Sequence, residues 1–334
     1  MKILVYLPRS LGASLQALPC LRSLKENFPT ASISILPPEK FAQFFLAVTP
    51  EYSLIALPEV KEIAGLQRAS SRLKKMLFEV GLLLDETFAS ALLFYLARIP
   101  QRWGYDREGR GFMLTKRLSL KAVDPQLHLK YHYLNILEHL GLKVEDRPYH
   151  LTLPSNLLTA AETRLRQAGL RPEDPTVVIK PGSSFGPARV WPLNHQVGLI
   201  KKLISRSYRV VLVGSQASQE ISRQIMPQID GRAADLTGQL TLEETAGILA
   251  MARVYLGNDS GLTHVANFLG VPVVSLYGPT DPHLCGPVQA PAAALKKSVP
   301  CSPCSYRSCP YDHRCLENIS INEVMEFISS FMTP

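Results

Sequence analysis

Short apolar runs alternate along the chain with amphipathic stretches. After the first run, for example, Ala17, Leu21, Leu24 and Phe28 recur at the spacing of one helical face. Regular alternation of strand and helix predicts parallel sheets covered by helices, so the expected fold class is α/β with doubly wound, Rossmann-like units. The strand-like runs cover residues 2–7, 31–36, 81–85, 176–179, 209–214 and 252–256.

The chain is long enough for two domains. It has 334 residues, of which 46% are hydrophobic, and this suffices for two cores of ordinary size. We expect one Rossmann-like domain over residues 1–160 and a second over residues 170–320, with residues 154–175 forming a helix and a polar hinge. Residues 321–334 end the chain as a helix with an apolar side.

The segment 257–270 is the most informative in the sequence. It follows a strand-like run, and Asp259 and Ser260 supply the chemistry of a helix N-cap. Thr263 and His264 fall in the first turn of the helix that follows. A helix N-terminus offers unpaired N–H groups and partial positive charge, so this turn predicts an anion site. Asp259 and His264 add groups that suit a neighbouring sugar or ribose.

A second loop of the same kind covers residues 180–192. It also follows a strand and precedes a helix, and it contains Ser183, Ser184 and Arg189. Both loops fall at the carboxyl ends of predicted parallel strands, where open α/β sheets bind ligands. Ser183 and Ser184 also fit ordinary loop composition, and a lone helical His264 also fits a purely structural role.

Four blocks in order along the chain carry a family resemblance. They are residues 180–192, residues 257–280, the Gly- and Arg-rich residues 102–115, and the Cys-rich tail 301–315. Together they resemble glycosyltransferase family 9, the bacterial heptosyltransferases. The resemblance implies a GT-B fold, in which two Rossmann-like domains face a central cleft and the terminal helix packs back on the N-terminal domain. It also implies inverting, metal-independent transfer of heptose from ADP-heptose to the heptose of the lipopolysaccharide inner core, with no cofactor.

The resemblance assigns the donor to the second domain and the acceptor to the first. An anionic lipopolysaccharide-core acceptor would then lie near Gly12, Arg102, Arg107 and Arg110. The expected donor-binding residues are Ser183, Ser184, Arg189, Asp259, Ser260, Gly261, Thr263 and His264.

The general base is missing from its expected place. The family has an Asp after the glycine of the first strand–helix loop, whereas here Gly12 is followed by Ala13. An engineered substitution, a relocated base and an inactive homologue remain open, so no catalytic base is named. Two other functions stay open with them: a nucleotide-sugar-binding protein without turnover, and a GT-B transferase that uses another nucleotide sugar.

The balance of charge is basic. The formal net charge of +8 suits an anionic partner, such as a glycolipid or a phospholipid surface, and also fits simple solubility charge. We expect no nucleic-acid partner and a cytoplasmic location, at the inner face of the inner membrane. Besides the acceptor arginines, the basic residues run together at Arg68, Arg72, Lys74, Lys75, Lys116 and Arg117.

Four cysteines gather near the end of the chain. Cys301, Cys304, Cys309 and Cys315 could hold a structural metal ion, form disulfides or remain reduced thiols, and their spacing matches no common zinc template. We favour reduced thiols and expect no catalytic metal. His128 and His132 have metal-like helical spacing, but no acidic residue lies between them, so we interpret them as a solvated helical face.

Overall fold

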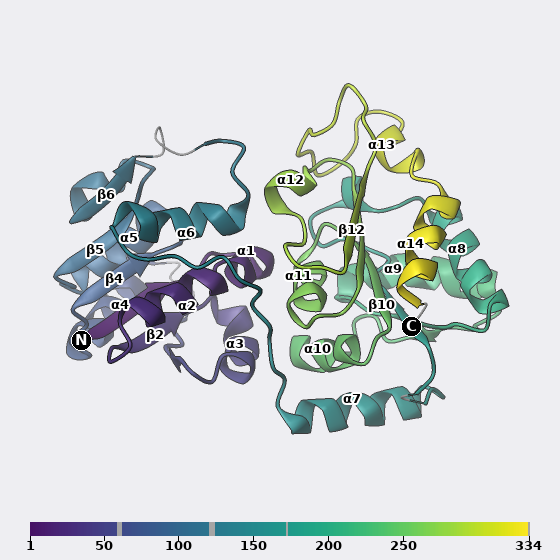
Figure 1. The fold of residues 1–334 in the computed structure, drawn as a ribbon, viewed down its shortest axis with the longest axis horizontal. Helices are drawn as coiled ribbons and strands as arrows, with labels where there is room; N and C mark the ends of the chain where they lie inside the picture. Colours follow the sequence, from purple (N-terminus) through teal and green to yellow (C-terminus); the bar gives the residue numbers. More distant parts are fainter. Residues whose placement is uncertain (59–61, 120–123, 172, 333–334) are drawn as a thin grey trace. The chain divides into compact units, whose positions relative to one another are not determined.

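The computed structural model describes residues 1–58, 62–119, 124–171 and 173–332. It forms two compact units, residues 1–149 and 150–334 (Figure 1). The division therefore falls earlier than the boundary predicted from the sequence. The reason is that helix α7 (Ser155–Gln167) packs closely on α10 (Leu242–Ala250), where a Cβ at Gly247 would lie 2.8 Å from the Cβ of Ala161. The predicted hinge helix is thus part of the second unit.

The first unit is a parallel sheet with strand order β3-β2-β1-β4-β5-β6. Its strands are β1 (Lys2–Tyr6), β2 (Ser32–Leu36), β3 (Ser53–Leu54), β4 (Val80–Leu83), β5 (Gln101–Asp106) and β6 (Lys116–Ser119). Its helices are α1 (Leu11–Gln16), α2 (Leu18–Asn27), α3 (Ala42–Val48), α4 (Ile63–Lys75), α5 (Phe88–Leu96) and α6 (Leu129–His139), with short 3₁₀ turns η1 (Glu39–Phe41) and η2 (Arg110–Met113).

The second unit repeats this arrangement, with strand order β12-β11-β10-β7-β8-β9. Its strands are β7 (Thr176–Ile179), β8 (Arg209–Leu212), β9 (Ala234–Asp235), β10 (Val254–Asn258), β11 (Val273–Tyr277) and β12 (Ala292–Lys296). Besides α7 and α10 its helices are α8 (Leu193–Ser205), α9 (Gln216–Ile225), α11 (Gly261–Phe268), α12 (Pro282–Cys285), α13 (Arg314–Glu317) and α14 (Ile321–Met332), with 3₁₀ turns η4 (Pro187–Arg189) and η5 (Met226–Ile229).

The second sheet buries its central strands completely. Every residue of β7 and β10 is buried, because helices cover both faces of each parallel sheet, and this explains the uninterrupted apolar runs in the sequence. The predicted α/β class and the six strand-like runs are confirmed. No helix in the described part of the chain is long and apolar enough to cross a bilayer.

The terminal helix α14 contributes to the core of the second unit. Val324, Met325 and Ile328 lie in the core of the second unit, and Figure 1 shows α14 beside α8, with which it is in contact. Lys202 on α8 also donates a hydrogen bond of 2.7 Å to Asn322 on α14. Val324, Met325 and Ile328 are therefore used within the second unit, and the predicted packing of this helix against the first domain stays a prediction.

Strand order reverses once in each sheet. The reversal falls between β1 and β4 in the first unit and between β7 and β10 in the second. At such switch points the loops on the two sides diverge, and open α/β sheets bind ligands in the crevice beyond the carboxyl ends of the strands. The fold therefore predicts ligand sites at the loops that follow β7 and β10, and at those that follow β1 and β4.

Candidate functional site

The two loops singled out in the sequence meet at the switch point of the second unit. Strands β7 and β10 are paired, with Ile179 opposite Leu256. The loop from Lys180 to Arg189 and the turn from Asp259 to Thr263 therefore leave the sheet at neighbouring positions. The structure thus brings together the two predicted donor-binding loops.

An ion pair joins these loops. The Arg189 guanidinium lies 2.9 Å from the Asp259 carboxylate and also donates to the Asp259 backbone carbonyl at 3.1 Å. Both side chains are largely buried, with 17% and 10% exposed. The guanidinium lies 3.9 Å from the centroid of the Phe185 ring, a cation–π contact that fixes its plane. Arg189 is thus held at the site by a carboxylate and an aromatic ring together.

The N-terminus of α11 opens beside this pair. Ser260 is the N-cap in extended conformation, but its side chain makes no capping hydrogen bond. The Thr263 hydroxyl donates instead to the Asn258 carbonyl at 2.7 Å, which ties the helix start to the end of β10. The first N–H groups of α11 are therefore not capped by the Ser260 hydroxyl, and they suit an anionic ligand.

Ser183 and Ser184 shape the other loop. The Ser183 hydroxyl accepts from the Phe185 N–H at 3.2 Å, and the Ser184 hydroxyl lies 3.0 Å from that of Ser215. These contacts order the loop around Phe185. They also mean that both hydroxyls already have partners within the chain, so their predicted donor contacts stay predictions.

The Cys-rich segment supports this loop, a role that the sequence did not reveal. Arg307 donates from Nε to the Phe185 carbonyl at 2.9 Å, and its own carbonyl accepts from the Ala188 N–H at 3.0 Å. Gly186 has φ of 150°, and a Cβ there would lie 2.3 Å from the Arg307 carbonyl oxygen, so only glycine allows this close approach. The His313 ring nitrogen Nε2 lies 2.8 Å from the Ala188 carbonyl oxygen.

The four cysteines themselves form no recognisable metal centre. All six cysteines of the chain are free, and among the described residues no group of three or more His, Cys, Asp or Glu side chains could hold a metal ion. The described hydrogen bonds of this segment run to the loop 180–189 and also to Gly278 and Pro279, directly after β11.

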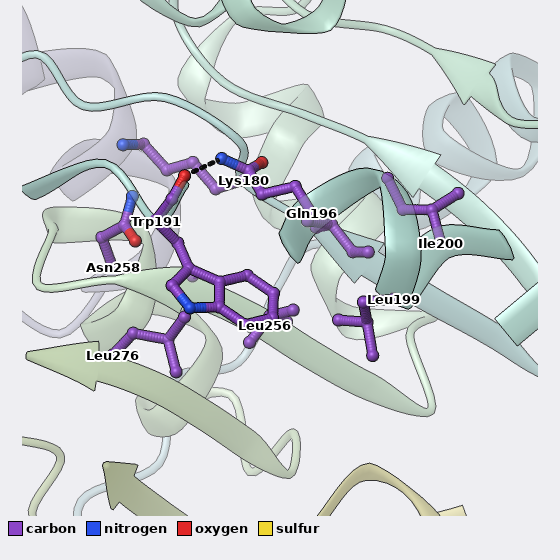
Figure 2. A pocket seen from close by; sticks show the side chains of 10 residues that line it. Lys180, Trp191, Gln196, Leu199, Ile200, Leu256, Asn258 and Leu276 are labelled. Carbon is purple, nitrogen blue, oxygen red and sulfur yellow. Dashed lines mark hydrogen bonds between the residues drawn. The ribbon is translucent and has the colours of Figure 1, made fainter. Parts of the chain in front are cut away.

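Two buried polar groups lie beneath the loops. Figure 2 shows the Lys180 ammonium and the Asn258 amide at the same end of a group of side chains, away from Leu199 and Ile200. The Asn258 amide nitrogen has no hydrogen-bond partner, and the Lys180 ammonium donates to the Gly182 carbonyl at 2.6 Å. The cavity they line holds about 10 Å³, room for about one water molecule, so it cannot be a sugar-nucleotide site.

Lys180 is a second cation of the site that sequence reasoning missed. The pKa of Lys180 is lowered from 10.5 to about 8, mainly by burial and also by the like charge of Arg189, while Asp259 opposes both effects. Its position directly after β7 was the available signal, because a lysine that ends a buried strand is held at the binding edge of the sheet. His264, also predicted, is buried in the first turns of α11.

The first unit offers a helix N-terminus but no base at residue 13. Gly12 and Ala13 lie in α1, and the Ser10 hydroxyl caps this helix by accepting from the Ala13 N–H at 3.2 Å. The neighbouring Ser14 hydroxyl donates to the Pro8 carbonyl at 2.6 Å and is buried. Ser14 is therefore committed to the fold and cannot replace a carboxylate.

Carboxylates do lie at the same edge of the first sheet. Asp85, after β4, is 3.3 Å from the Arg9 guanidinium, after β1. Glu86 contacts both His132 of α6 and the Arg107 guanidinium, and these hydrogen bonds outweigh burial and lower its pKa below the usual value. His132 is thus mostly buried and paired, whereas the sequence predicted a solvated face, and His128 is the N-cap of α6.

Arg110 corrects a prediction about the acceptor. Its side chain is completely buried, and it donates to the backbone carbonyls of Tyr105 and Asp85 at 2.8 and 2.6 Å. Arg110 therefore holds the loop that follows β5 and is closed to an acceptor. Arg102 is similarly engaged with the carbonyls of Ile99 and Met113, whereas Arg107 is mainly exposed. Arg110 could not be placed from sequence because its partners are backbone carbonyls.

The fold and the site define the class of protein. Two units with the same six-stranded parallel topology, each with one switch point, make up the fold of GT-B glycosyltransferases. The family model of glycosyltransferase family 9 (heptosyltransferase) matches residues 66–314, and the chain belongs to this family of transferases.

Named relatives cover almost the whole chain. Lipopolysaccharide heptosyltransferase 2 of Salmonella typhimurium is 31% identical over 307 residues, with 89% of this chain and 88% of the relative covered. The Escherichia coli protein of that name is 30% identical over the same shares. The solved structure of E. coli ADP-heptose lipopolysaccharide heptosyltransferase II superposes with a TM-score of 0.84 at 26% identity, covering 99% of this chain and 98% of that one.

Proposed function

We propose that this protein is an inverting, metal-independent glycosyltransferase that moves heptose from ADP-heptose to the heptose of the lipopolysaccharide inner core. The observation that carries the proposal is the Arg189–Asp259 pair beside the open N-terminus of α11. The names of the relatives supply the sugar and the acceptor. We place the reaction in the cytoplasm, at the inner face of the inner membrane.

The second unit would stabilise the leaving group. In the proposed reaction the acceptor hydroxyl attacks the anomeric carbon, the bond from that carbon to the diphosphate breaks, and ADP leaves with the charge. Arg189, Lys180 and the N–H groups of α11 provide positive potential for the diphosphate, and such preorganised electrostatics suffice for this role without a metal ion. Asp259, already partly buried, would accept a hydrogen bond from a donor hydroxyl.

The first unit would hold the acceptor near Gly12, where the N-terminus of α1 faces the switch point between β1 and β4. Arg107, the mainly exposed arginine of the predicted set, would contact the anionic groups of the core. The attacking hydroxyl must still lose its proton, and Ala13 cannot accept it. A nucleotide-sugar-binding protein without turnover is therefore the second candidate, favoured by Ala13 and by the committed hydroxyl of Ser14.

Nucleotide selectivity and product formation test the proposal together. ADP should displace ADP-heptose from the protein, whereas UDP and GDP should compete poorly, and a heptose-bearing core acceptor should gain one heptose. Tight ADP-heptose binding without any product would favour the binding-protein alternative. Preference for UDP or GDP would favour a GT-B transferase with another donor.

A further inference from the structure

The outer face of α5 in the first unit is apolar. Helices that cover a sheet normally expose polar side chains, but every residue of α5 except the buried Ser90 is apolar. Ala91, Leu93 and Phe94 are buried against the sheet, while Phe88, Tyr95 and Leu96 remain 40%, 47% and 40% exposed. Phe88 and Tyr95 are seven residues apart and so lie along one side of the helix. This face has no partner among the described residues that would bury it.

Phe112 extends the apolar face beyond the helix. It lies in η2 and is 71% exposed, and its ring centroid is 6.4 Å from that of Phe88. The turn that carries Phe112 is held in place by Arg110, which is fully buried and donates hydrogen bonds to backbone carbonyls. A large aromatic side chain is thus held outward by a rigid loop.

Helix α4 packs beside α5 and is basic on its outer face. Arg68, Arg72 and Lys75 are exposed one turn apart. Together with Ala64, Gln67 and Ser71 they line an open groove of about 480 Å³. Arg72 also donates a hydrogen bond to the Ala56 carbonyl at 2.9 Å, and this contact restrains the orientation of its guanidinium. Arg68, Arg72 and Lys75 thus form a basic face on the helix that packs against α5.

We propose that this α4–α5 surface, made of Arg68, Arg72, Lys75, Phe88, Tyr95, Leu96 and Phe112, docks the protein on a bilayer that carries anionic lipids. Aromatic side chains are stable at the boundary between head groups and acyl chains, and basic residues beside them are attracted to anionic head groups. Nucleic acid would complement only the charge of the basic residues. The exposed apolar side chains of α5 and Phe112 fit a partner with an apolar interior, such as a bilayer.

The inference deepens the proposed function, because it names the surface that would bring the enzyme to a lipid-anchored acceptor. The proposed docking rests on the proposed function only for its biological role, which is to reach a lipid-anchored acceptor. Donor binding belongs to the second unit and is measured separately with ADP, so failure of docking and failure of the proposed function give different results.

Vesicle co-sedimentation with the full chain tests the surface. We expect binding to vesicles of phosphatidylcholine and phosphatidylglycerol in equal parts, weak binding to pure phosphatidylcholine, and loss of binding in high salt. The triple variant Arg68→Glu, Arg72→Glu, Lys75→Glu should lower the partition coefficient at least about tenfold, since each basic residue near an anionic surface contributes on the order of fivefold. The pair Tyr95→Ser, Phe112→Ser should also lower it severalfold.

Matched changes on the second unit serve as controls. Charge reversal at the exposed Lys201, Arg223 and Arg253 changes the net charge by the same amount as the α4 triple variant. It should reduce vesicle binding far less than that variant does. ADP affinity and the far-ultraviolet circular dichroism spectrum should be unchanged in every variant, which excludes misfolding. Equal vesicle binding by the wild type and both surface variants would overturn the proposal. Self-association through this surface without vesicle binding, or binding to an oligonucleotide in place of vesicles, would overturn it as well.

Discussion

Arg189 and Asp259 neutralise each other across the two loops of the second unit, with 2.9 Å between guanidinium and carboxylate. Both are largely buried, so neither is compensated by bulk water. A diphosphate that enters this site would offer Arg189 a second anion, and Asp259 would be released to bind a hydroxyl group. The pair thus keeps the cation in place, and binding of the proposed donor would exchange one charge-assisted contact for another.

Replacing Arg189 tests this relationship. We expect Arg189→Met to weaken ADP binding about tenfold to hundredfold, because charge-assisted hydrogen bonds contribute on the order of 1.5–3 kcal/mol. Isothermal titration calorimetry with ADP measures the change. Arg209→Met, at an exposed arginine of the same unit that faces Asp174, is the control and should leave the affinity unaltered. An unaltered affinity in Arg189→Met would remove this arginine from the donor site.

Asp259 and His264 should matter to the reaction itself. We expect Asp259→Ala and His264→Ala each to lower turnover or ADP-heptose affinity at least about tenfold, as the loss of a positioned polar group commonly does. His283→Ala, at an exposed histidine of α12, provides the matched control. Kinetics like those of the wild type in both variants would show that the assigned site is wrong.

Lys180 should make stability depend on pH above neutrality. Its pKa is about 8 in the folded protein and near 10.5 when exposed, so between these values the folded state binds fewer protons than the unfolded state. The free energy of unfolding should therefore rise with pH from about 8 to 10.5 through this group, and the cost of the buried ammonium is fully present below about pH 8. Urea unfolding at several pH values checks this.

The variant Lys180→Met isolates that contribution. The stability of the wild type relative to Lys180→Met should increase as pH rises from 7 to 10. The exposed Lys201→Met should show no such trend. A constant difference between wild type and Lys180→Met across this range would mean that Lys180 keeps an ordinary pKa.

Arg110 should stabilise the fold of the first unit and have no role in ADP binding. We expect Arg110→Met to destabilise the first unit by about 3 kcal/mol, since several buried carbonyls lose a charged donor, while ADP affinity stays unaltered. The chain has two tryptophans, Trp103 in the first unit and Trp191 in the second, so urea unfolding in a Trp191→Phe background reports on the first unit. Arg107→Met on the same loop is exposed and should cost far less. Equal stability of both variants would contradict the buried role.

Sequence predicted the fold better than the role of single cations. The strand-like runs could be predicted because buried parallel strands are apolar throughout, and the turn before α11 because cap residues directly follow a strand-like run. The role of this turn in donor binding stays a prediction. Arg110 lies in a stretch of glycines and arginines whose composition is typical of an exposed loop. The backbone carbonyls that bind its guanidinium are brought around it only by folding. Likewise, Gly186 and Arg307 approach each other across more than a hundred residues, a contact that no local pattern encodes.

The packing of the last helix within the second unit could not be predicted for a related reason. Val324 and Ile328 predict an apolar side for α14, but periodicity does not say which surface it covers. In the structure that surface is α8 and the strands β10 and β11 of the second unit. The Cys-rich segment posed the same problem, because cysteine spacing suggests metal chemistry, whereas its described hydrogen bonds run to the loop 180–189 and to Gly278 and Pro279.

The most direct test of the account is heptose transfer by the protein as it stands and by Ala13→Asp, followed by mass spectrometry of a heptose-bearing core acceptor. The account predicts addition of one heptose from ADP-heptose. It also predicts that Ala13→Asp raises turnover, with unaltered donor affinity, by a factor of about 10²–10⁴, the usual contribution of a general base. No product from either protein, although ADP-heptose binds to both, would contradict the assignment of this chain as a heptosyltransferase.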